Sequence, residues 1–289
     1  MRNPIIYKKK IIISGSTVEI LSYEIPITHG FEISPKWREK RRLAKLSAKA
    51  NLSEQQLQER RKRNRKLAMI RASKTLIRLI DCNVYQYKNT VGRIYLPVFL
   101  TLTFKEDVRE QKEANRLFTL FIKRLNYHVN KKIRNPLRYS VVIEFQDLNR
   151  KGVIHYHTLF YDLPFIRSTT LENLWGEGSI NINKVHKVKK IGLYVSKYMS
   201  KNFEDPRLDG HKRYFSSRGL IKPKTYAGEE AYRIVKSVIP TEVTVKVSNF
   251  TTEKLGSVTK ELFSFPEKEH IGEHISSEFR ELLEKYDIS

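Results

Sequence analysis

The sequence predicts an α+β protein built around an antiparallel sheet, and three observations support this prediction. Between residues 98 and 202, β-branched and aromatic runs alternate with stretches in which apolar residues recur every three or four positions. Only the short segment LNRKG separates the runs at 139–146 and 153–161, so these two runs fit a β-hairpin. Apolar residues make up 40% of the 289 residues, which is enough to build a buried core.

The central region contains seven expected elements in a recognisable order. They are a strand at 98–104, a helix at 106–130, strands at 139–146 and 153–161, a helix at 169–175, a strand at 179–187 and a helix at 191–202. This β-α-β-β-α-β-α order is that of ferredoxin-like and RNA-recognition-type (RRM-like) sandwiches, in which helices pack on an antiparallel sheet.

The N-terminal region predicts a β-hairpin followed by a basic helical arm. β-branched runs at 5–13 and 17–25 flank a Ser-Gly-Ser turn. Two helices are expected at about 36–50 and 53–80, the second of which begins with a capping box. We therefore divide the chain into a hairpin and arm (1–90), a central domain (91–225) and a C-terminal extension with an acidic helix (226–289).

The charge of the chain points to a polyanionic partner. There are 55 Lys and Arg against 31 Asp and Glu, a formal charge of +24. Residues 36–80 hold 16 Lys and Arg against three Glu, whereas residues 251–289 hold five against nine acidic residues. We expect the basic arm to contact nucleic-acid phosphates; the alternative is a solvated arm without a partner. The candidate DNA-binding residues are Arg41, Arg42, Arg60, Arg61, Lys62, Arg63, Arg65 and Lys66.

Several classes of protein are excluded or disfavoured. A single cysteine, Cys82, excludes an intramolecular disulfide and a four-cysteine zinc site. No GxxxxGK(S/T) loop is present, so an NTP-driven helicase is not encoded in the sequence. The longest mostly apolar run, 95–104, is about half of a membrane span, and no signal peptide opens the sequence. We expect a soluble cytoplasmic protein without a membrane partner.

The strand at 153–161 carries His155 and His157, which share one face because strand side chains alternate. A turn centred on Arg150-Lys151 would place Glu144 opposite His157 and Gln146 opposite His155, whereas a slip of one residue would turn both oxygens away. Two imidazoles and a carboxylate or amide oxygen suit Mg²⁺ or Mn²⁺. The alternative is an ordinary histidine pair on a sheet surface.

The helix at 191–202 carries a polar stripe of Tyr194, Lys197, Tyr198 and Lys201 at positions i, i+3, i+4 and i+7. A phenol has a pKa near 10 and needs a nearby cation or base to attack at neutral pH. Lys197 can supply that charge or hold a phosphate. The alternative is an amphipathic surface helix with incidental tyrosines. His270 and His274 lie four apart on the acidic helix, where a solvated face is the simpler interpretation.

These motifs, in this order, resemble the HUH endonuclease superfamily of rolling-circle replication initiators. The matching segments are FLTLTF at 99–104, EFQ at 144–146, HYH at 155–157 and YVSKY at 194–198, and KRYFSSRGL at 212–220 resembles sequence that follows the tyrosine motif. The likeness is closest to replication proteins of small single-stranded DNA phages and related plasmids. It covers about residues 95–222, and the arm and tail match loosely or not at all.

The resemblance implies an HUH-type catalytic domain and a specific chemistry. Mg²⁺ or Mn²⁺ would be held by His155 and His157 with Glu144 or Gln146. Tyr194 or Tyr198 would cut single-stranded origin DNA, leaving a 5′-phosphotyrosine and a 3′-hydroxyl, while Lys197 and Lys201 steady the phosphate charge. Tyr194 to Lys197 also satisfies the Tyr-x-x-Lys motif of one-tyrosine relatives, in which case Tyr198 is structural. A host helicase and polymerase, in a bacterial cytoplasm, are the expected partners.

Two other interpretations stay open at this point. A non-catalytic basic module that binds single-stranded DNA explains the charge and the aromatic residues, but not the histidine pair or the tyrosine stripe. A conjugative relaxase or a tyrosine transposase uses the same chemistry. Relaxases usually place the tyrosine before the histidine motif, whereas Tyr194 and Tyr198 follow it here.

Overall fold

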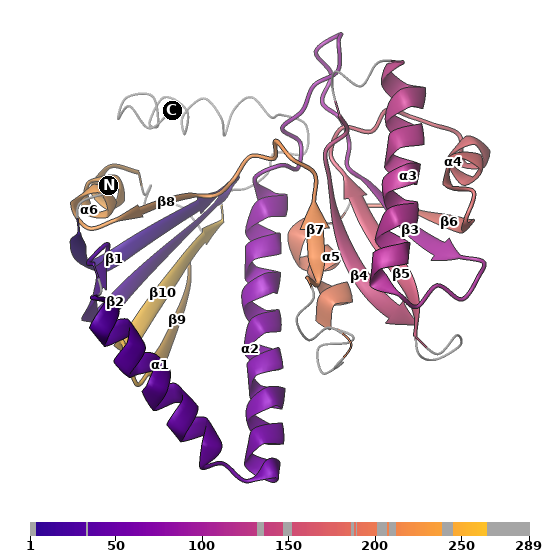
Figure 1. Ribbon diagram of the computed structural model, residues 1–289. Helices are drawn as coiled ribbons and strands as arrows, with labels where there is room; N and C mark the ends of the chain where they lie inside the picture. Colours follow the sequence, from indigo (N-terminus) through magenta and orange to yellow (C-terminus); the bar gives the residue numbers. More distant parts are fainter. Residues whose placement is uncertain are drawn as a thin grey trace. The chain divides into compact units, whose positions relative to one another are not determined.

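The chain is α+β, as the sequence predicts. The computed structural model describes residues 4–32, 34–131, 136–146, 152–185, 188, 190–200, 207, 212–238 and 245–264. Over these residues it contains two five-stranded antiparallel sheets and six α-helices (Figure 1). The chain divides into two compact units, one formed by residues 65–222 and one that combines the residues up to 64 with those from 223 onward.

The unit at 65–222 contains every element predicted for the central region. Its strands are β3 (Val98–Phe104), β4 (Tyr139–Gln146), β5 (Val153–Phe160), β6 (Gly178–Lys184) and β7 (Tyr214–Ser216), and its helices include α3 (Gln111–Asn130), α4 (Ser168–Trp175) and α5 (Ile191–Ser200). The strand order β6-β3-β5-β4-β7 places the four predicted strands in the fourth-first-third-second order of the split βαβ motif. The short edge strand β7 is an addition that periodicity did not predict.

The two faces of this sheet are covered by different helices. On one face, Leu102, Phe104 and Tyr156 form a core with α3 and α4. On the other face, Phe99 and Leu159 pack with α5 and with the C-terminal end of α2 (Glu54–Asp81). The sheet is therefore the middle layer of three, with α3 and α4 on one side and α5 on the other (Figure 1).

The position of α5 depends on a close approach to α2. A Cβ atom at Gly192 would lie 2.7 Å from Oδ1 of Asp81 and 3.0 Å from the carbonyl oxygen of Ile77. Only glycine lets the first turn of α5 lie this close to the last turn of α2. Ile191 and Val195 then enter the core.

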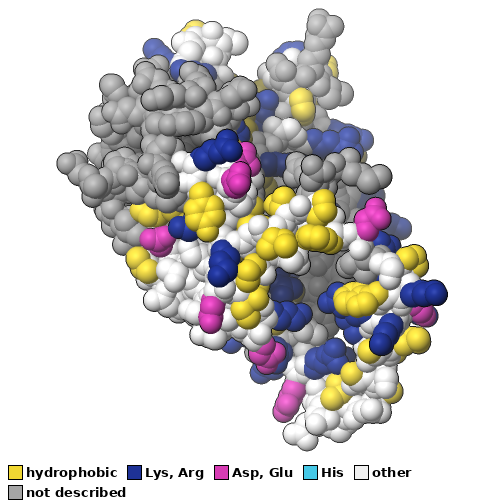
Figure 2. All heavy atoms as spheres, turned by 90° about the vertical axis from the view of Figure 1, so that its left-hand side faces the viewer, with side chains coloured by type: hydrophobic (Ala, Val, Ile, Leu, Met, Phe, Trp, Pro, Cys, Tyr) yellow, Lys and Arg dark blue, Asp and Glu magenta, His cyan; other side chains and the backbone are white. Residues whose placement is uncertain are grey.

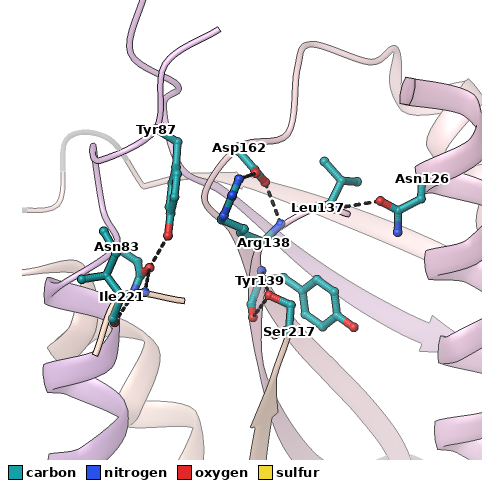
Figure 3. A network of polar contacts seen from close by, with 9 residues as sticks. All are labelled: Asn83, Tyr87, Asn126, Leu137, Arg138, Tyr139, Asp162, Ser217 and Ile221. Atoms are coloured by element: carbon teal, nitrogen blue, oxygen red, sulfur yellow. Dashed lines mark hydrogen bonds and ion pairs between the residues drawn. The ribbon is translucent and has the colours of Figure 1, made fainter. Parts of the chain in front are cut away.

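A polar network fixes the segment that follows α2 (Figure 3). The Asn83 side chain donates to the carbonyl oxygen of Ile221 (2.8 Å) and accepts from its N–H (3.0 Å), as a neighbouring strand would. The Tyr87 hydroxyl donates to Asn83, and the Arg138 guanidinium lies 4.5 Å from the Tyr87 ring centre. Arg138 also pairs with Asp162 at 2.9 Å, so the network ties the segment to the ends of β4 and β5.

The second unit joins the two ends of the chain in one sheet. Its strands are β1 (Ile5–Ser14), β2 (Thr17–His29), β8 (Lys224–Ala227), β9 (Val245–Thr252) and β10 (Gly256–Ser264), in the order β8-β1-β2-β10-β9, and α6 (Glu229–Val238) packs on it. The predicted hairpin is confirmed. The predicted division at 90/91 and 225/226 differs from the two units, because β10 pairs with β2 and β8 with β1.

The two basic helices are confirmed as α1 (Pro35–Ala50) and α2. The capping box is present: the Ser53 N–H donates to Gln56 Oε1 at 3.0 Å, and the Gln56 N–H donates to Ser53 Oγ at 3.3 Å. The predicted acidic helix, with His270 and His274, lies outside the described residues. Among the helices that the structure describes, none is long and apolar enough to cross a membrane.

Candidate functional site

His155 and His157 are both buried in β5, and their neighbours on β4 differ in register from the prediction. Glu144 lies opposite His155, and Gln146 lies opposite Val153. The predicted pairing of Glu144 with His157 and Gln146 with His155 is therefore wrong by two residues. The reason is that the Gly152 N–H bonds to the Gln146 carbonyl at 2.9 Å, with Gly152 at φ 86°, which extends the hairpin closer to its turn.

Because the register differs by an even number of residues, both oxygen-bearing side chains remain on the histidine face. Glu144 reaches diagonally across the two strands, and its Oε2 makes a hydrogen bond with Nε2 of His157. The Nδ1 atom of His157 lies 3.2 Å from Oγ1 of Thr101, which is opposite His157 on β3. When Nε2–H donates to the carboxylate, Nδ1 accepts from the threonine hydroxyl, so both ring nitrogens are engaged.

The tyrosine stripe of α5 lies directly against this histidine. The Tyr198 ring stacks on the His157 imidazole with a centroid distance of 3.9 Å, and the phenolic oxygens of Tyr198 and Tyr194 lie 3.2 Å apart. Phe99 contacts all three rings at centroid distances of 5.5 to 5.9 Å. Two motifs that are 37 positions apart in the sequence are thus brought together around one aromatic side chain.

The electrostatics of this cluster disfavour a charged Tyr198. Burial is the main cause that raises the pKa of the Tyr198 phenol, and its hydrogen bond with Tyr194 and the nearby Glu144 carboxylate raise it further. A phenolate here needs a compensating cation. Lys197 lies between the two tyrosines on α5 and is exposed. Lys201, the last member of the predicted stripe, lies outside the described residues.

The donor set around His157 fits a divalent cation. Oε2 of Glu144 and Nε2 of His157 meet at one point, with His155 on the same face. Oε1 of Gln146 is buried and has no hydrogen-bond partner within the described part of the chain, which is costly unless something binds it. Imidazole, carboxylate and amide oxygen suit Mg²⁺ or Mn²⁺. No group of three or more His, Cys, Asp or Glu side chains able to hold a metal occurs among the described residues.

Two residues of this site, Phe99 and Thr101, received no role from the sequence analysis. Both lie in the apolar-looking run VFLTLTF, where a threonine at every second position is the only signal. In the sheet that alternation places Thr101 and Phe99 on the histidine face. Their role depends on the pairing of β3 with β5, which local sequence does not specify.

The predicted DNA-binding residues lie on α1 and α2. Arg65 is half-buried and the other seven are exposed, and Arg42 pairs with Glu39 at 2.8 Å. Figure 2 views the molecule from the left-hand side of Figure 1, and on that face Lys and Arg side chains lie among apolar and acidic ones. The arm therefore offers separate cationic side chains rather than one continuous patch on this face.

Comparison with known proteins gives one match. Residues 97–203, from the start of β3 to just beyond α5, match the family model for the replication-associated protein ORF2. The matched span contains the histidine pair, Glu144, Gln146 and both tyrosines of α5. No curated protein and no solved structure matches the chain significantly. The family match supports a role in the initiation of replication.

Proposed function

We propose that the protein is a rolling-circle replication initiator of the HUH type, which nicks and rejoins single-stranded DNA at a replication origin. The observation that carries the proposal is the contact between the two motifs: Tyr198 stacks on His157 at 3.9 Å, and the Tyr194 oxygen lies 3.2 Å from that of Tyr198. Two phenols beside a buried histidine and carboxylate form a nucleophile with its activating groups. A module that only binds DNA has no use for this arrangement.

The chemistry proposed is a phosphoryl transfer to tyrosine. The phenolic oxygen of Tyr194 or Tyr198 forms a bond to the scissile phosphorus and loses its proton, while the bond from phosphorus to O3′ breaks and O3′ gains a proton. The products are a 5′-phosphotyrosine and a free 3′-hydroxyl that can prime synthesis. Attack by a 3′-hydroxyl on the phosphotyrosine reverses the step and rejoins a strand, and with two phenols one can hold an end while the other cuts.

The cations of the site have separate roles in the proposal. Lys197 projects from α5 between the tyrosines, where it can offset the negative charge of the transferring phosphate, and Lys201 follows one turn later in the sequence. Glu144 and His157, with His155 and Gln146 beside them, would hold Mg²⁺ or Mn²⁺. That ion would supply Lewis-acid polarisation of a phosphate oxygen.

The rest of the chain supplies affinity and partners in this proposal. The basic side chains of α1 and α2 make phosphate contacts that do not depend on base sequence. Because the sequence contains no phosphate-binding loop for NTP, duplex unwinding falls to a host helicase, and a host polymerase extends the 3′-hydroxyl. The proposed setting is the cytoplasm of a bacterial host of a phage or plasmid.

The test is to trap the covalent intermediate. The full-length protein is incubated with circular single-stranded DNA and Mn²⁺, the products are run on a denaturing gel, and adducted peptides are identified by mass spectrometry. We expect a 5′-DNA adduct on the peptide that contains Tyr194 or Tyr198. A matched control is Tyr127→Phe, which removes an exposed phenol from α3 and should leave the adduct unchanged. Tight binding without any adduct, across an origin library and several metals, would favour the non-catalytic binding module.

A further inference from the structure

The histidine face of the sheet continues past the histidines as a row of uncharged polar side chains. In register, His157 lies opposite Thr101, and Thr101 lies opposite Asn181 on β6. One pleat along, His155 lies opposite Thr103, and Thr103 lies opposite Ser179. Adjacent strands are about 4.8 Å apart, so Asn181 lies about 10 Å across the sheet from His157.

This half of the face is open. Helix α5 packs on β4 and β5, on the far side of the histidine pair from β6. Ser179 and Asn181 are exposed on the edge strand, while Thr101 and Thr103 are half-buried and the histidines are buried. Polar side chains thus lead from the edge of the sheet to the proposed reaction centre.

The polar residues of β6 have no structural task that accounts for them. Within the described part of the chain, the side chains of Ser179, Asn181 and Asn183 make no hydrogen bond or ion pair. Asparagine is depleted in strands, yet it occupies two alternate positions here, with Ile180 and Ile182 turned to the other face. An edge strand can be protected from aggregation by lysine, glutamate or proline, and none of these lies between Ser179 and Asn183.

The position of β6 is fixed by its first residue. A Cβ at Gly178 would lie 2.1 Å from the carbonyl oxygen of Thr103 and 2.6 Å from the backbone nitrogen of Lys105. The indole N–H of Trp175 donates to the same Thr103 oxygen at 3.1 Å. Because glycine allows this close approach, the register that aligns Asn181 with Thr101 and His157 is set at the start of the strand.

We propose that Ser179, Asn181 and Asn183 form a subsite that reads the bases of the single-stranded DNA next to the scissile phosphate. The proposal rests on the proposed function, because it takes the DNA strand to the histidine face. Phosphates are bound by cations, and this strip has none on a chain of charge +24. An asparagine amide can both donate to and accept from a base edge, as it does with adenine. The strip therefore selects sequence, while the cations elsewhere supply affinity.

The experiment separates base reading from both affinity and cleavage. A randomised single-stranded DNA library is bound by the full-length protein with Mn²⁺, and the retained strands are sequenced; the same library is scored for tyrosine adducts. The test variants are Asn181→Ala with Asn183→Ala, and Asn181→Thr with Asn183→Thr, the second of which preserves strand propensity. The matched control is Ile182→Thr, on the same strand but the opposite face.

We expect the wild type to show a base preference that both asparagine variants lose at one or two adjacent positions. Affinity for the preferred sequence should fall about tenfold or more, with the slope of binding against salt unchanged because no charge is removed. The Ile182→Thr protein should keep the preference. An unchanged preference in folded asparagine variants overturns the subsite, even where adducts form normally. Base preference in the wild type without any adduct overturns the proposed nuclease instead and leaves the variants to judge the subsite.

Discussion

The two faces of the sheet β6-β3-β5-β4-β7 share one backbone but have opposite contents. On the face toward α3 and α4, Tyr156 is buried among Phe104 and Phe118, and its hydroxyl donates to Asn115 at 2.6 Å. On the other face, the residues before and after Tyr156 are His155 and His157, which lie with Glu144 and the tyrosines of α5. Three consecutive residues therefore serve a hydrophobic core and a polar site.

This difference shows how a small domain can combine stability with a polar site. Side chains alternate along a strand, so substitutions on one face leave the other face with its own neighbours. The apolar face supplies the burial energy that holds the strands in register. The polar face can then keep buried groups, such as Oε1 of Gln146, that a core does not tolerate without a partner. Substitutions on the two faces should therefore change different quantities.

The largest effect is expected from the tyrosines. Replacing Tyr194 and Tyr198 together by Phe removes both nucleophilic oxygens but keeps the rings that pack on Phe99. Cleavage of single-stranded DNA should fall by about 10³-fold or more, while DNA affinity and thermal stability change little. The measurement is a gel-based nicking assay beside a binding titration. Residual nicking near the wild-type rate would rule out both phenols as nucleophiles.

The histidines should show a loss of activity that is linked to metal binding. In His155→Ala or His157→Ala we expect nicking to fall about a hundredfold or more and to lose its dependence on Mn²⁺, because an imidazole donor is gone. Calorimetric titration with Mn²⁺ measures the binding directly. His128→Ala, at an exposed position near the end of α3, is the matched control. Unchanged Mn²⁺ binding in both site variants would contradict the metal site.

A substitution on the apolar face should give the reverse pattern. Leu102 lies opposite Tyr156 on β3 and is fully buried. Leu102→Ala should lower the free energy of unfolding by about 2–5 kcal/mol, because it removes packed atoms and leaves a cavity. Urea unfolding measures this loss, and the nicking rate per folded molecule should stay close to that of the wild type. A rate that falls as far as in the tyrosine variants would mean that the two faces are not independent.

The basic arm should affect how binding depends on salt rather than the chemistry. Replacing Arg60, Arg61, Lys62 and Arg63 by Gln should flatten the plot of log K against log salt by about 0.7 for each phosphate of single-stranded DNA that is no longer neutralised. Fluorescence anisotropy at several salt concentrations gives the slope. The control is Lys246→Gln with Lys254→Gln, two exposed lysines in and just after β9. An unchanged slope in the arm variant would mean that these side chains face away from DNA.

The smallest effect is a pH dependence from the network in Figure 3. Burial raises the pKa of the Asp162 carboxyl, although the Arg138 N–H and guanidinium oppose this. A raised pKa in the folded state means that this contribution to stability is full below the unfolded pKa, about 3.9, and is lost as pH rises through the folded pKa. The free energy of unfolding of the wild type minus that of Asp162→Asn should therefore decrease from acid toward neutral pH. An increase would mean that Arg138 outweighs burial.

The sequence by itself determined the features that depend on local period and composition. The strands and helices between residues 98 and 200, the two basic helices and the first hairpin follow from alternation and helical spacing. That Glu144 shares the face of the histidines follows as well, since an even shift in register does not change the face. The stripe of Tyr194 and Tyr198 is also local, because it needs only the helical repeat.

Tertiary structure decided what depends on long-range pairing. The diagonal reach of Glu144 to His157, the contact of Thr101 with His157 and the stacking of Tyr198 on that ring come from strand register and from the docking of α5. The hydrogen bond of the Ser257 N–H to Glu24, 233 positions away, belongs to a sheet that joins both ends of the chain. Local patterns give each segment its shape and apolar face, but which segments pair is set by the burial that the whole chain achieves against the entropy of closing long loops.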